Sequence, residues 1–434
     1  MKSKFVLLLV ALSLSAGAQE ILTLGSALQT GLQNNFSIVL QNNNVQVLKN
    51  NNTAGNAGML PSLGWTAAQN NTVYTTHQES FSGTVKDVRS KMNTSLNSGL
   101  QLNWTLFDGM NMFVNRQTLG MMQQIGENQS RIVVENSIVQ IARLYYNIIQ
   151  LKKVIEVDQD AVNLSLERKK IAEAQLALGS GDRQQLLQST VDLNADSSQL
   201  KLQLLLLQNA KSDLNYLLAR DAATPFDIID SIHLMNLASC EDIVAKAMTQ
   251  NSELLAAKMD QHLSELDVKS AQSERYPKLN LQSGYNFILQ KSQTGFAKFN
   301  QSYGPYFGLT ASCNIFNGSN TSREIRNARI MLNNSEITVR QASLDIRTSI
   351  LKLYNSYTTS LELVRLEAGN INAAQQNVDM AFAKYKLGTI TDIELREVQK
   401  KLLDAQYLML QAQFDAKNAE IELMQLSGDL IGLF

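Results

Sequence analysis

An internal duplication constrains the fold of this chain more than any other feature of its sequence. Three short motifs occur twice and in the same order. A Pro-x-Leu motif recurs 216 residues further on, and a Phe-[Asp/Asn]-Gly and a Leu-Gly-[Ser/Thr] motif each recur 209 residues further on. A period this long indicates a duplicated half-domain, because solenoid repeats have periods of about 20–50 residues. The paired motifs are 61–63 and 277–279, 107–109 and 316–318, and 178–180 and 387–389.

These motifs predict two structural repeats behind a leader. Residues 1–18 are predicted to be a secretory signal peptide, because Lys2 and Lys4 precede a short apolar core and Ala16-Gly17-Ala18 is a typical cleavage site. No Cys follows that site, so we expect no amino-terminal lipid anchor. The repeats are predicted at 19–238 and 239–434. Their expected elements are short helices at 24–58 and 241–275, β-hairpins at about 61–107 and 277–316, long helices at 110–178 and 319–387, and following helices at 182–219 and 391–428, with a linker closing the first repeat.

Composition narrows the class of protein. The net charge of −1 gives no indication of a nucleic-acid partner. The two cysteines, Cys240 and Cys313, could form a disulfide in an oxidising compartment, but their dissimilar surroundings favour two separate thiols. Beyond the signal peptide no apolar run is long enough for a transmembrane helix. If this exported protein crosses a membrane, it must therefore do so as β-structure.

Both predicted hairpins alternate apolar and polar residues with a period of two. Such a pattern places apolar side chains on one face of a strand and polar ones on the other. We expect four strands of about ten residues, the length of a tilted strand that crosses a bilayer, with external turns at 75–93 and 290–302. A half-buried sheet of a soluble protein would show the same alternation. The polar face, however, is rich in amides and hydroxyls. We expect Leu100, Leu102 and Trp104 to face lipid or an aromatic belt at its boundary, and the following residues to face an aqueous lumen: Asn97, Gln101, Asn103, Asn280 and Gln282.

The number of strands predicts oligomerisation. A closed barrel needs about eight strands, and an unpaired strand edge is not tolerated in lipid. One chain offers only four strands, so several chains must combine theirs if the strands cross a membrane.

The predicted long helices contain no proline and have apolar residues at alternating spacings of three and four. This pattern is typical of coiled-coil packing. Gly179 and Gly388 can adopt the left-handed conformation that ends a helix, so each long helix is expected to turn back into the following one. Taken alone, the helices would also fit an antiparallel coiled-coil rod. Rods do not carry a β-hairpin at the base of each helical pair, and this chain has two.

The ordered set of motifs, repeated after a signal peptide, resembles the TolC family of outer-membrane efflux proteins from Leu24 to Gly432. The resemblance implies a mainly α fold with a small β part. A homotrimer would pool four strands from each protomer into a 12-stranded transmembrane β-barrel, above a hollow α-helical barrel in the periplasm of a Gram-negative bacterium. It further implies an exit duct of a tripartite efflux or type I secretion system. Such a duct docks to a periplasmic adaptor and, through it, to an inner-membrane pump.

The resemblance also implies two functional places. The helical turns would dock the adaptor, through Leu178, Gly179, Ser180, Leu387, Gly388 and Thr389. A periplasmic gate would lie just beyond them, with Tyr385 at the family's tip tyrosine and Glu394 and Glu397 forming acidic rings in the trimer. Carboxylate rings favour cations, although a solvated helix face would carry the same residues. Ile390 stands at the position of a gating arginine, and Gln185 and Gln188 replace acidic residues of the gate, which puts that polar link in question here.

No enzyme site is expected. The three histidines are scattered without metal-ligand spacing, and the chain has neither a nucleophile elbow nor a phosphate-binding loop. We therefore predict no catalytic residue, cofactor or metal. Two other functions fit parts of the pattern. One is a non-transporting, surface-anchored coiled-coil scaffold or adhesin, and the other is a secreted soluble coiled coil. The sequence does not identify the cargo.

Overall fold

The structure is a computed structural model that describes residues 20–229, 231–293 and 297–430. The predicted signal peptide lies outside these residues. Backbone contacts divide the chain into two units. Unit 1 comprises residues 1–43, 128–255 and 340–434, and unit 2 comprises 44–127 and 256–339. Each unit thus combines segments from both halves of the sequence, so the compact units do not coincide with the predicted repeats.

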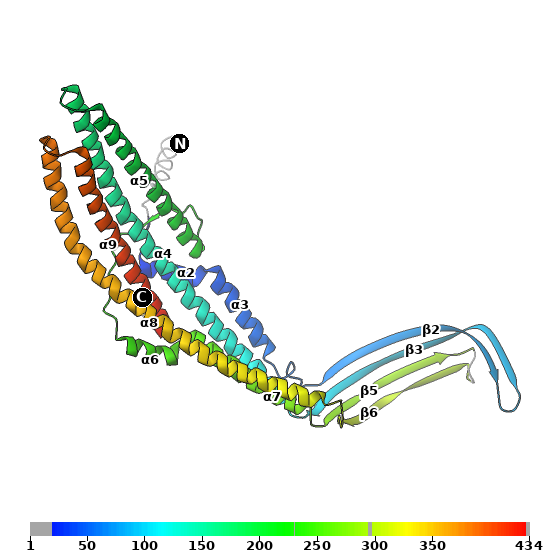
Figure 1. Ribbon diagram of the computed structural model, residues 1–434. Helices are drawn as coiled ribbons and strands as arrows, with labels where there is room; N and C mark the ends of the chain where they lie inside the picture. The colour runs from blue at the N-terminus through cyan, green and yellow to red at the C-terminus, as the bar shows by residue number, and fades with distance from the viewer. Residues whose placement is uncertain (1–19, 230, 294–296, 431–434) are drawn as a thin grey trace, which may run out of the picture. The chain divides into compact units, whose positions relative to one another are not determined.

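Helices dominate the described chain (Figure 1). The long helices predicted at 110–178 and 319–387 are α4 (Asn111–Ala177) and α8 (Asn320–Lys386), of 67 residues each. The helices that follow them are α5 (Arg183–Leu217) and α9 (Asp392–Ser427). No helix among the described residues is both long and apolar enough to span a membrane.

The core of unit 1 forms where α4 meets α2 (Leu24–Asn34) and α5. Ile138, Ile141, Tyr145 and Ile148 of α4 are each at most 5% exposed, as their spacing of three and four predicts. A short parallel pair that the sequence did not predict closes this core. Its strands are β1 (Glu20–Ile21) and β4 (Phe226–Asp227).

The two short helices of the prediction are each broken by an asparagine. The first becomes α2 and α3 (Phe36–Asn51), separated by Asn35, and the second becomes α6 (Cys240–Gln250) and α7 (Ser252–Ser273), separated by Asn251. Each side-chain oxygen accepts a hydrogen bond from the backbone at the start of the next helix. Each amide also donates to a carbonyl at the end of a long helix, that of Leu217 or Leu426, 209 residues apart. A single helix was therefore the wrong prediction, and the break is itself duplicated.

The Phe-x-Gly motifs explain how a strand passes into a long helix in unit 2. Gly109 and Gly318 have φ of +73° and +68°, and the residues after them, Met110 and Ser319, are also left-handed. Two successive left-handed residues reverse the chain, a conformation that glycine adopts at little cost. Before the first pair, the carboxylate of Asp108 caps α4 by accepting the amide of Met112.

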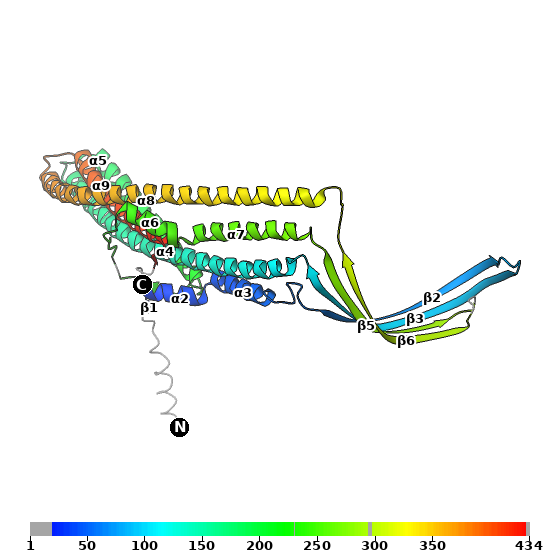
Figure 2. The same ribbon diagram turned by 90° about the horizontal axis from the view of Figure 1, so that it is seen from below.

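The four predicted strands form one antiparallel sheet in the order β2-β3-β5-β6 (Figure 2). They are longer than the ten residues expected. β2 is Ser62–Glu79 and β3 is Val85–Asp108, whereas β5 is Lys278–Lys291 and β6 is Phe299–Ser312. The external turn predicted at 75–93 is wrong, because most of this segment continues as a two-stranded ribbon of β2 and β3. Cys313 and Ile315, which the predicted hairpin at 277–316 includes, follow the end of β6. Both cysteines are free.

The strand register divides the sheet into two chemically different faces. Asn103 pairs with Gln282, and Thr105 pairs with Asn280 and donates a hydrogen bond of 3.0 Å to its side chain. Directly paired residues share a face and neighbours along a strand alternate. Asn97, Gln101, Asn103, Asn280 and Gln282 therefore lie together on one face, which we call the polar face. The opposite, apolar face has rows such as Trp65, Leu100, Tyr285 and Pro305 across all four strands.

Candidate functional site

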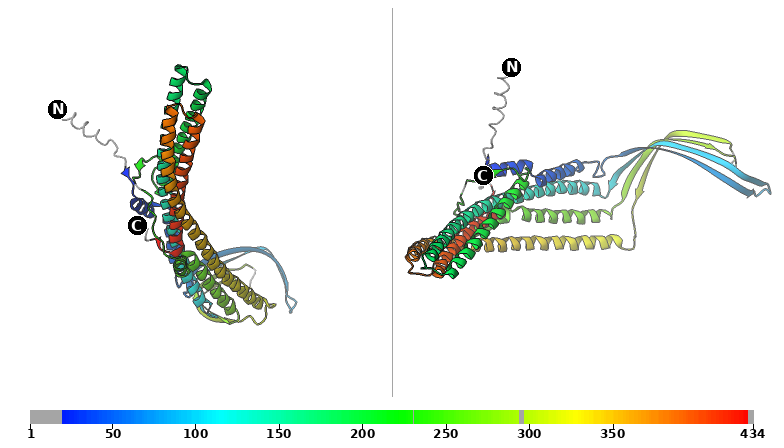
Figure 3. Two further views of the ribbon diagram at one scale, coloured as in Figure 1. Left: turned by 60° about the vertical axis from the view of Figure 1, so that its left-hand side comes forward. Right: turned by 90° about the horizontal axis from the view of Figure 1, so that it is seen from above.

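Two matching turns lie at the same end of unit 1 (Figure 3). The α4–α5 turn contains Gly179 with φ of +74°, and the α8–α9 turn contains Gly388 with φ of +73°. In both, the next residue donates its amide to a carbonyl five positions back, from Ser180 to Gln175 and from Thr389 to Lys384. This is the Schellman pattern that ends a helix at a left-handed residue. The leucines before these glycines, Leu178 and Leu387, are 82% and 78% exposed.

The helices that follow the two turns, α5 and α9, each begin after a residue whose side chain caps the helix. Asp182 accepts the amide of Gln184 at the start of α5. Thr391 and Glu394 form a reciprocal capping box at the start of α9, in which Glu394 accepts the amide of Thr391 at 2.7 Å. That backbone bond, followed by the Thr391 hydroxyl, lowers the pKa of the Glu394 carboxyl. Its carboxylate therefore has a local structural role.

A cleft of about 620 Å³ separates the two turns. Its wall is formed by the ends of α4 and α8 and the starts of α5 and α9, and it includes Gln185, Gln188, Tyr385, Ile390 and Asp392. Amide side chains from one turn thus face a buried aromatic and a carboxylate from the other. The turns can hold a polar partner in this cleft and present an exposed leucine on each side of it.

Tyr385 joins the two turns. Its side chain is 1% exposed and packs with Leu395, while its hydroxyl accepts a hydrogen bond of 3.0 Å from Gln185. Burial raises the pKa of the Tyr385 phenol, and the Gln185 bond opposes this effect only in part. The phenol is therefore neutral at physiological pH. A neutral hydrogen bond connects the first repeat to the second here.

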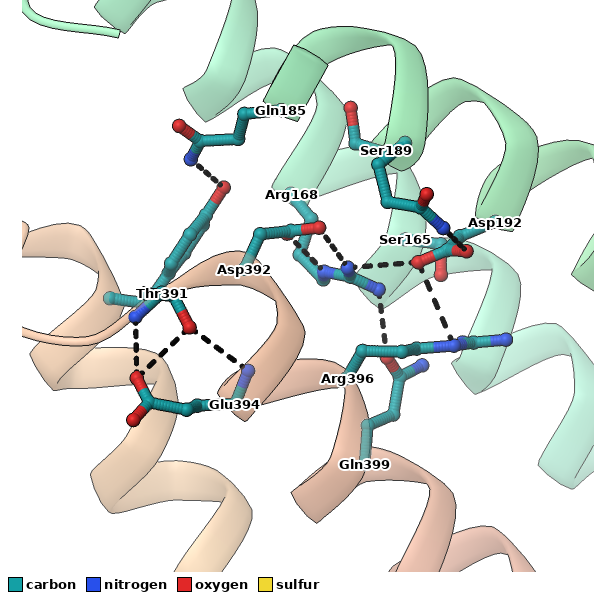
Figure 4. Close-up of polar contacts among 12 residues, drawn as sticks. Ser165, Arg168, Gln185, Ser189, Asp192, Thr391, Asp392, Glu394, Arg396 and Gln399 are labelled. Atoms are coloured by element: carbon teal, nitrogen blue, oxygen red, sulfur yellow. Dashed lines mark hydrogen bonds and ion pairs between the residues drawn. The ribbon is translucent and has the colours of Figure 1, made fainter. Parts of the chain in front are cut away.

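A fully buried arginine lies on α4, further from the turns than Tyr385. Arg168 of α4 is 0% exposed and binds Asp392 of α9 through two parallel bonds of 3.0 and 2.7 Å (Figure 4). It also donates to Asp192 of α5 at 3.0 Å and to Gln399 of α9 at 3.3 Å. Three helices from both halves of the sequence are thus tied to one guanidinium. Bidentate pairing of this kind is among the stronger hydrogen-bonding arrangements in proteins.

A second arginine extends the network along α9. Arg396 binds both carboxylate oxygens of Asp196, at 2.8 and 2.9 Å, and Ser165 donates to the same carboxylate. Burial would lower the pKa of Arg396, but Asp196, Asp192 and Asp392 outweigh it and raise that pKa. We call Arg168, Asp192, Asp196, Asp392 and Arg396 the tip network. Its three carboxylates exceed its two guanidinium groups by one negative charge.

The contact between α4 and α9 also contains a carboxyl group with one oxygen that has no hydrogen-bond partner. Asp158 of α4 is 2% exposed and accepts a hydrogen bond from the Tyr407 hydroxyl, but its second oxygen is buried without a hydrogen-bond partner. Burial raises the pKa of Asp158, the Tyr407 bond opposes this, and the charge of Asp196 adds to the increase. Ionised Asp158 therefore destabilises the helical packing around it.

Asp158→Asn is expected to stabilise the protein at pH 7 by on the order of 1 kcal/mol, because it removes a buried charge and keeps the Tyr407 bond. The folded-state pKa of this acid is raised, so ionisation reduces stability as pH rises from about 3.9, the usual aspartate value, through the folded-state pKa. The advantage of the variant should accordingly shrink as pH falls toward 4. Thermal unfolding midpoints of both proteins across this pH range would measure it. A wild type that is more stable at pH 7 would contradict this assignment.

The structure brings together some of the predicted gate residues and not others. Tyr385, Gln185 and Gln188 lie at the cleft, and Gln188 also binds Asp192 at 2.9 Å. Glu394 and Glu397 lie on the exposed side of α9. Glu394 caps its own helix, and Glu397 is 3.9 Å from Lys401. Their arrangement in rings remains a prediction, because it depends on further protomers.

The sequence interpretation missed the tip network. Ile390 brings no charge to the cleft, but Arg168 brings a guanidinium to Asp392 in the cleft wall from another helix. One signal could have indicated it. Arg168 and Asp192 are each twelve residues from Ser180, so a hairpin that turns there places them opposite one another. In the described part of the chain, no group of three or more His, Cys, Asp or Glu side chains is arranged to hold a metal ion.

Comparisons with known proteins agree on one family. The model of the outer membrane efflux protein family matches residues 243–429. The outer membrane efflux protein BepC of Brucella suis is 22% identical over 341 residues, covering 77% of this chain and 73% of that protein. The outer membrane protein TolC of Vibrio cholerae is 22% identical over 193 residues, which is 44% of each chain.

Solved structures have the same fold over nearly the whole chain. The CmeC outer membrane channel of Campylobacter jejuni matches with a TM-score of 0.78 at 13% identity, covering 94% of this chain and 86% of that one. The open state of the MtrE outer membrane channel of Neisseria gonorrhoeae matches with a TM-score of 0.71 at 14% identity, covering 94% and 89%.

Proposed function

We propose that this chain, a member of the outer membrane efflux protein family, is an outer-membrane exit duct that conducts substrates passively from the periplasm to the exterior. The observation that carries this function is the two-faced sheet of unit 2. One face is mainly apolar and suits lipid, and the other is mainly amides, hydroxyls and glycines and suits water. A wall with these two faces separates a membrane from an aqueous passage.

The outer strands of the sheet support assembly from several copies. β2 and β6 each have one edge that pairs with no other described strand. Unpaired backbone groups are not tolerated in hydrocarbon, so each β2 edge must find a β6 edge of another copy. In a homotrimer, twelve strands would close into a barrel, as the family resemblance implies. The helices would then lie in the periplasm.

The paired turns are the proposed docking site for a periplasmic adaptor. The exposed Leu178 and Leu387 flank a cleft lined with amides, and an added side chain at Gly179 or Gly388 would meet no atom within 4 Å. An adaptor hairpin could therefore approach both turns closely, inserting polar groups into the cleft. An inner-membrane pump would be reached through that adaptor.

The proposed gate combines the Tyr385–Gln185 bond with the tip network. The bond joins α5 to α8, and the tip network joins α4 and α5 to α9, so together they hold the two helical hairpins of one protomer in contact. Opening the turns of a trimer requires the hairpins to move apart, which would break these contacts. Glu394 and Glu397 would line the entrance as acidic rings.

Replacing both Glu394 and Glu397 by Gln is expected to reduce the preference of the channel for cations over anions by about twofold or more. Gln can still complete the capping box with Thr391, so the substitution removes charge while preserving the start of α9. Reversal potentials of single channels under a salt gradient would measure the change. Glu362→Gln, an exposed α8 residue away from the turns, is the matched control. Unchanged selectivity in the double variant would show that both residues belong to an ordinary solvated helix face and have no role in the gate.

Membrane fractionation and light scattering in mild detergent test the assembly. The protein is expected in the outer-membrane fraction. Its mass, after the contribution of bound detergent is subtracted, should be about 140 kDa, close to three copies of the 48.2 kDa chain without its leader. A monomer in a soluble fraction would contradict the pooled strands and leave a secreted coiled coil.

A further inference from the structure

A single aromatic ring stands on the polar face of the four-stranded part of the sheet. Tyr306 pairs with Gly284 and is flanked along β6 by Gly304 and Gly308. The other aromatic residues of these strands belong to the apolar face, apart from Tyr74, which lies where only β2 and β3 continue. The neighbours of Tyr306 on the polar face are small or carry amides and hydroxyls, except for Ile288.

Gly284 provides the place for this ring. A Cβ on Gly284 would lie 2.9 Å from both Cε1 and Oη of Tyr306, so the ring packs over the bare backbone of the neighbouring strand. The same Cβ would be 2.1 Å from the carbonyl oxygen of Leu100. Aromatic rings laid across a glycine in this way stabilise sheets. The Tyr306 ring is thereby held against the sheet, and its side chain remains partly exposed.

Charge is absent from most of the polar face. Among the strand residues, all of which the structure describes, charged side chains on this face occur only toward its ends. Asp108 pairs with Lys278 at the start of α4, and Lys86 and Lys91 lie in the two-stranded ribbon. Between them the wall cannot sort solutes by charge. The feature that distinguishes one solute from another there is the aromatic ring.

We propose that Tyr306 is a cargo-contacting residue of the exit duct, which retains planar aromatic solutes, and cationic ones above all, by stacking. The proposal rests on the proposed function, because it takes the polar face as the wall of the passage. Tyrosine rings attract other rings in offset stacks and attract cations to their faces. Amides and hydroxyls around the ring keep the passage hydrated. Three copies would place one such ring on each third of the wall.

Ethidium, a planar aromatic cation, is a suitable probe. Single channels of the full-length mature protein would be recorded in a planar bilayer, with ethidium added on the side of the Ser80–Thr84 turn. Tyr306→Ala should shorten the blockades by about two- to tenfold, as expected for the loss of one stacking partner. Tyr306→Phe keeps the ring and should behave as the wild type. Tyr303→Ala removes an aromatic from the apolar face of the same strand and should also leave the blockades unchanged.

The outcomes separate the two proposals. A wild-type protein that forms no ion-conducting channel contradicts the proposed function itself. A conducting wild type whose ethidium blockades are the same in Tyr306→Ala contradicts the aromatic contact alone. Shorter blockades in Tyr303→Ala but not in Tyr306→Ala would overturn the assignment of the faces. Equal small-ion conductance in all variants shows that Tyr306→Ala still assembles.

Discussion

Arg168→Met is expected to loosen the paired turns strongly. The substitution keeps an unbranched, apolar stem but leaves Asp392 and Asp192 buried without their guanidinium partner. Breaking a buried ion pair in this way costs about 3–5 kcal/mol. Amide hydrogen exchange in the first turns of α5 and α9 should therefore become faster by about a hundredfold or more, since 1.36 kcal/mol corresponds to a factor of ten. Channel conductance should rise, because the two hairpins separate more easily.

Three further variants make the Arg168 prediction specific. Lys153→Met removes a positive charge from the same helix, at an exposed pair with Glu156, and should change little. Arg168→Lys keeps the charge without the bidentate geometry and should give an intermediate effect. Adding Asp392→Asn to Arg168→Met should recover part of the loss, because one unpaired carboxylate is removed. If Arg168→Met exchanged its amides no faster than Lys153→Met, the network would not hold the turns.

Leu100→Arg is the second substitution with a large expected effect. Leu100 lies in the middle of β3 on the apolar face, in the row with Trp65 and Tyr285. An arginine facing lipid near the middle of a bilayer costs about 2–4 kcal/mol in a membrane β-barrel. Since each trimer would carry three such residues, assembly should fall severely. Heat-modifiable trimers in outer-membrane fractions, quantified on gels, would measure this loss.

The adjacent residue supplies the matched control. Gln101→Arg introduces the same side chain one position further along β3, on the polar face. The account expects nearly normal assembly for this variant, together with a shift of ion selectivity toward anions. An equal loss of assembly in both variants would show that the two faces of the sheet are exposed to the same environment. A larger defect for Gln101→Arg would reverse the assignment.

The helices and the faces of the strands could be predicted from the sequence because both follow from periodicity. Apolar residues at spacings of three and four fix the buried stripe of α4 through Ile141 and Tyr145. Alternation fixes which side chains of β3 lie together, and the observed register extends that division across the sheet. The duplication also predicted the helical turns at Gly179 and Gly388, because a motif that occurs twice in the same order does not arise easily by chance.

The prediction failed where local sequence does not determine the outcome. The ribbon of β2 and β3 beyond Thr72 has little alternation, so its polar residues indicated a turn, yet cross-strand pairing continues. Asn35 and Asn251 break helices that look continuous in sequence, because each side chain can replace a backbone acceptor. Their separation of 216 residues equals that of Pro61 and Pro277 and was the available signal.

The tip network could not be predicted from helix patterns alone. Arg168, Asp192 and Asp392 look like residues of three solvated faces, which is where most charges on helices occur. Only the packing of α4 against α5 and α9 removes water from all of them at once. The capping box of Thr391 and Glu394, in contrast, follows from residues three apart. It gives Glu394 a structural role beside the proposed one at the gate.

Conductance of the purified mature protein in planar lipid bilayers tests the central claim most directly. The account predicts discrete, long-lived single-channel currents from detergent-extracted trimers, with higher conductance in Arg168→Met. Trimers that insert stably into the bilayer and carry no current, in the wild type and in Arg168→Met alike, would contradict an exit duct and indicate a surface-anchored scaffold.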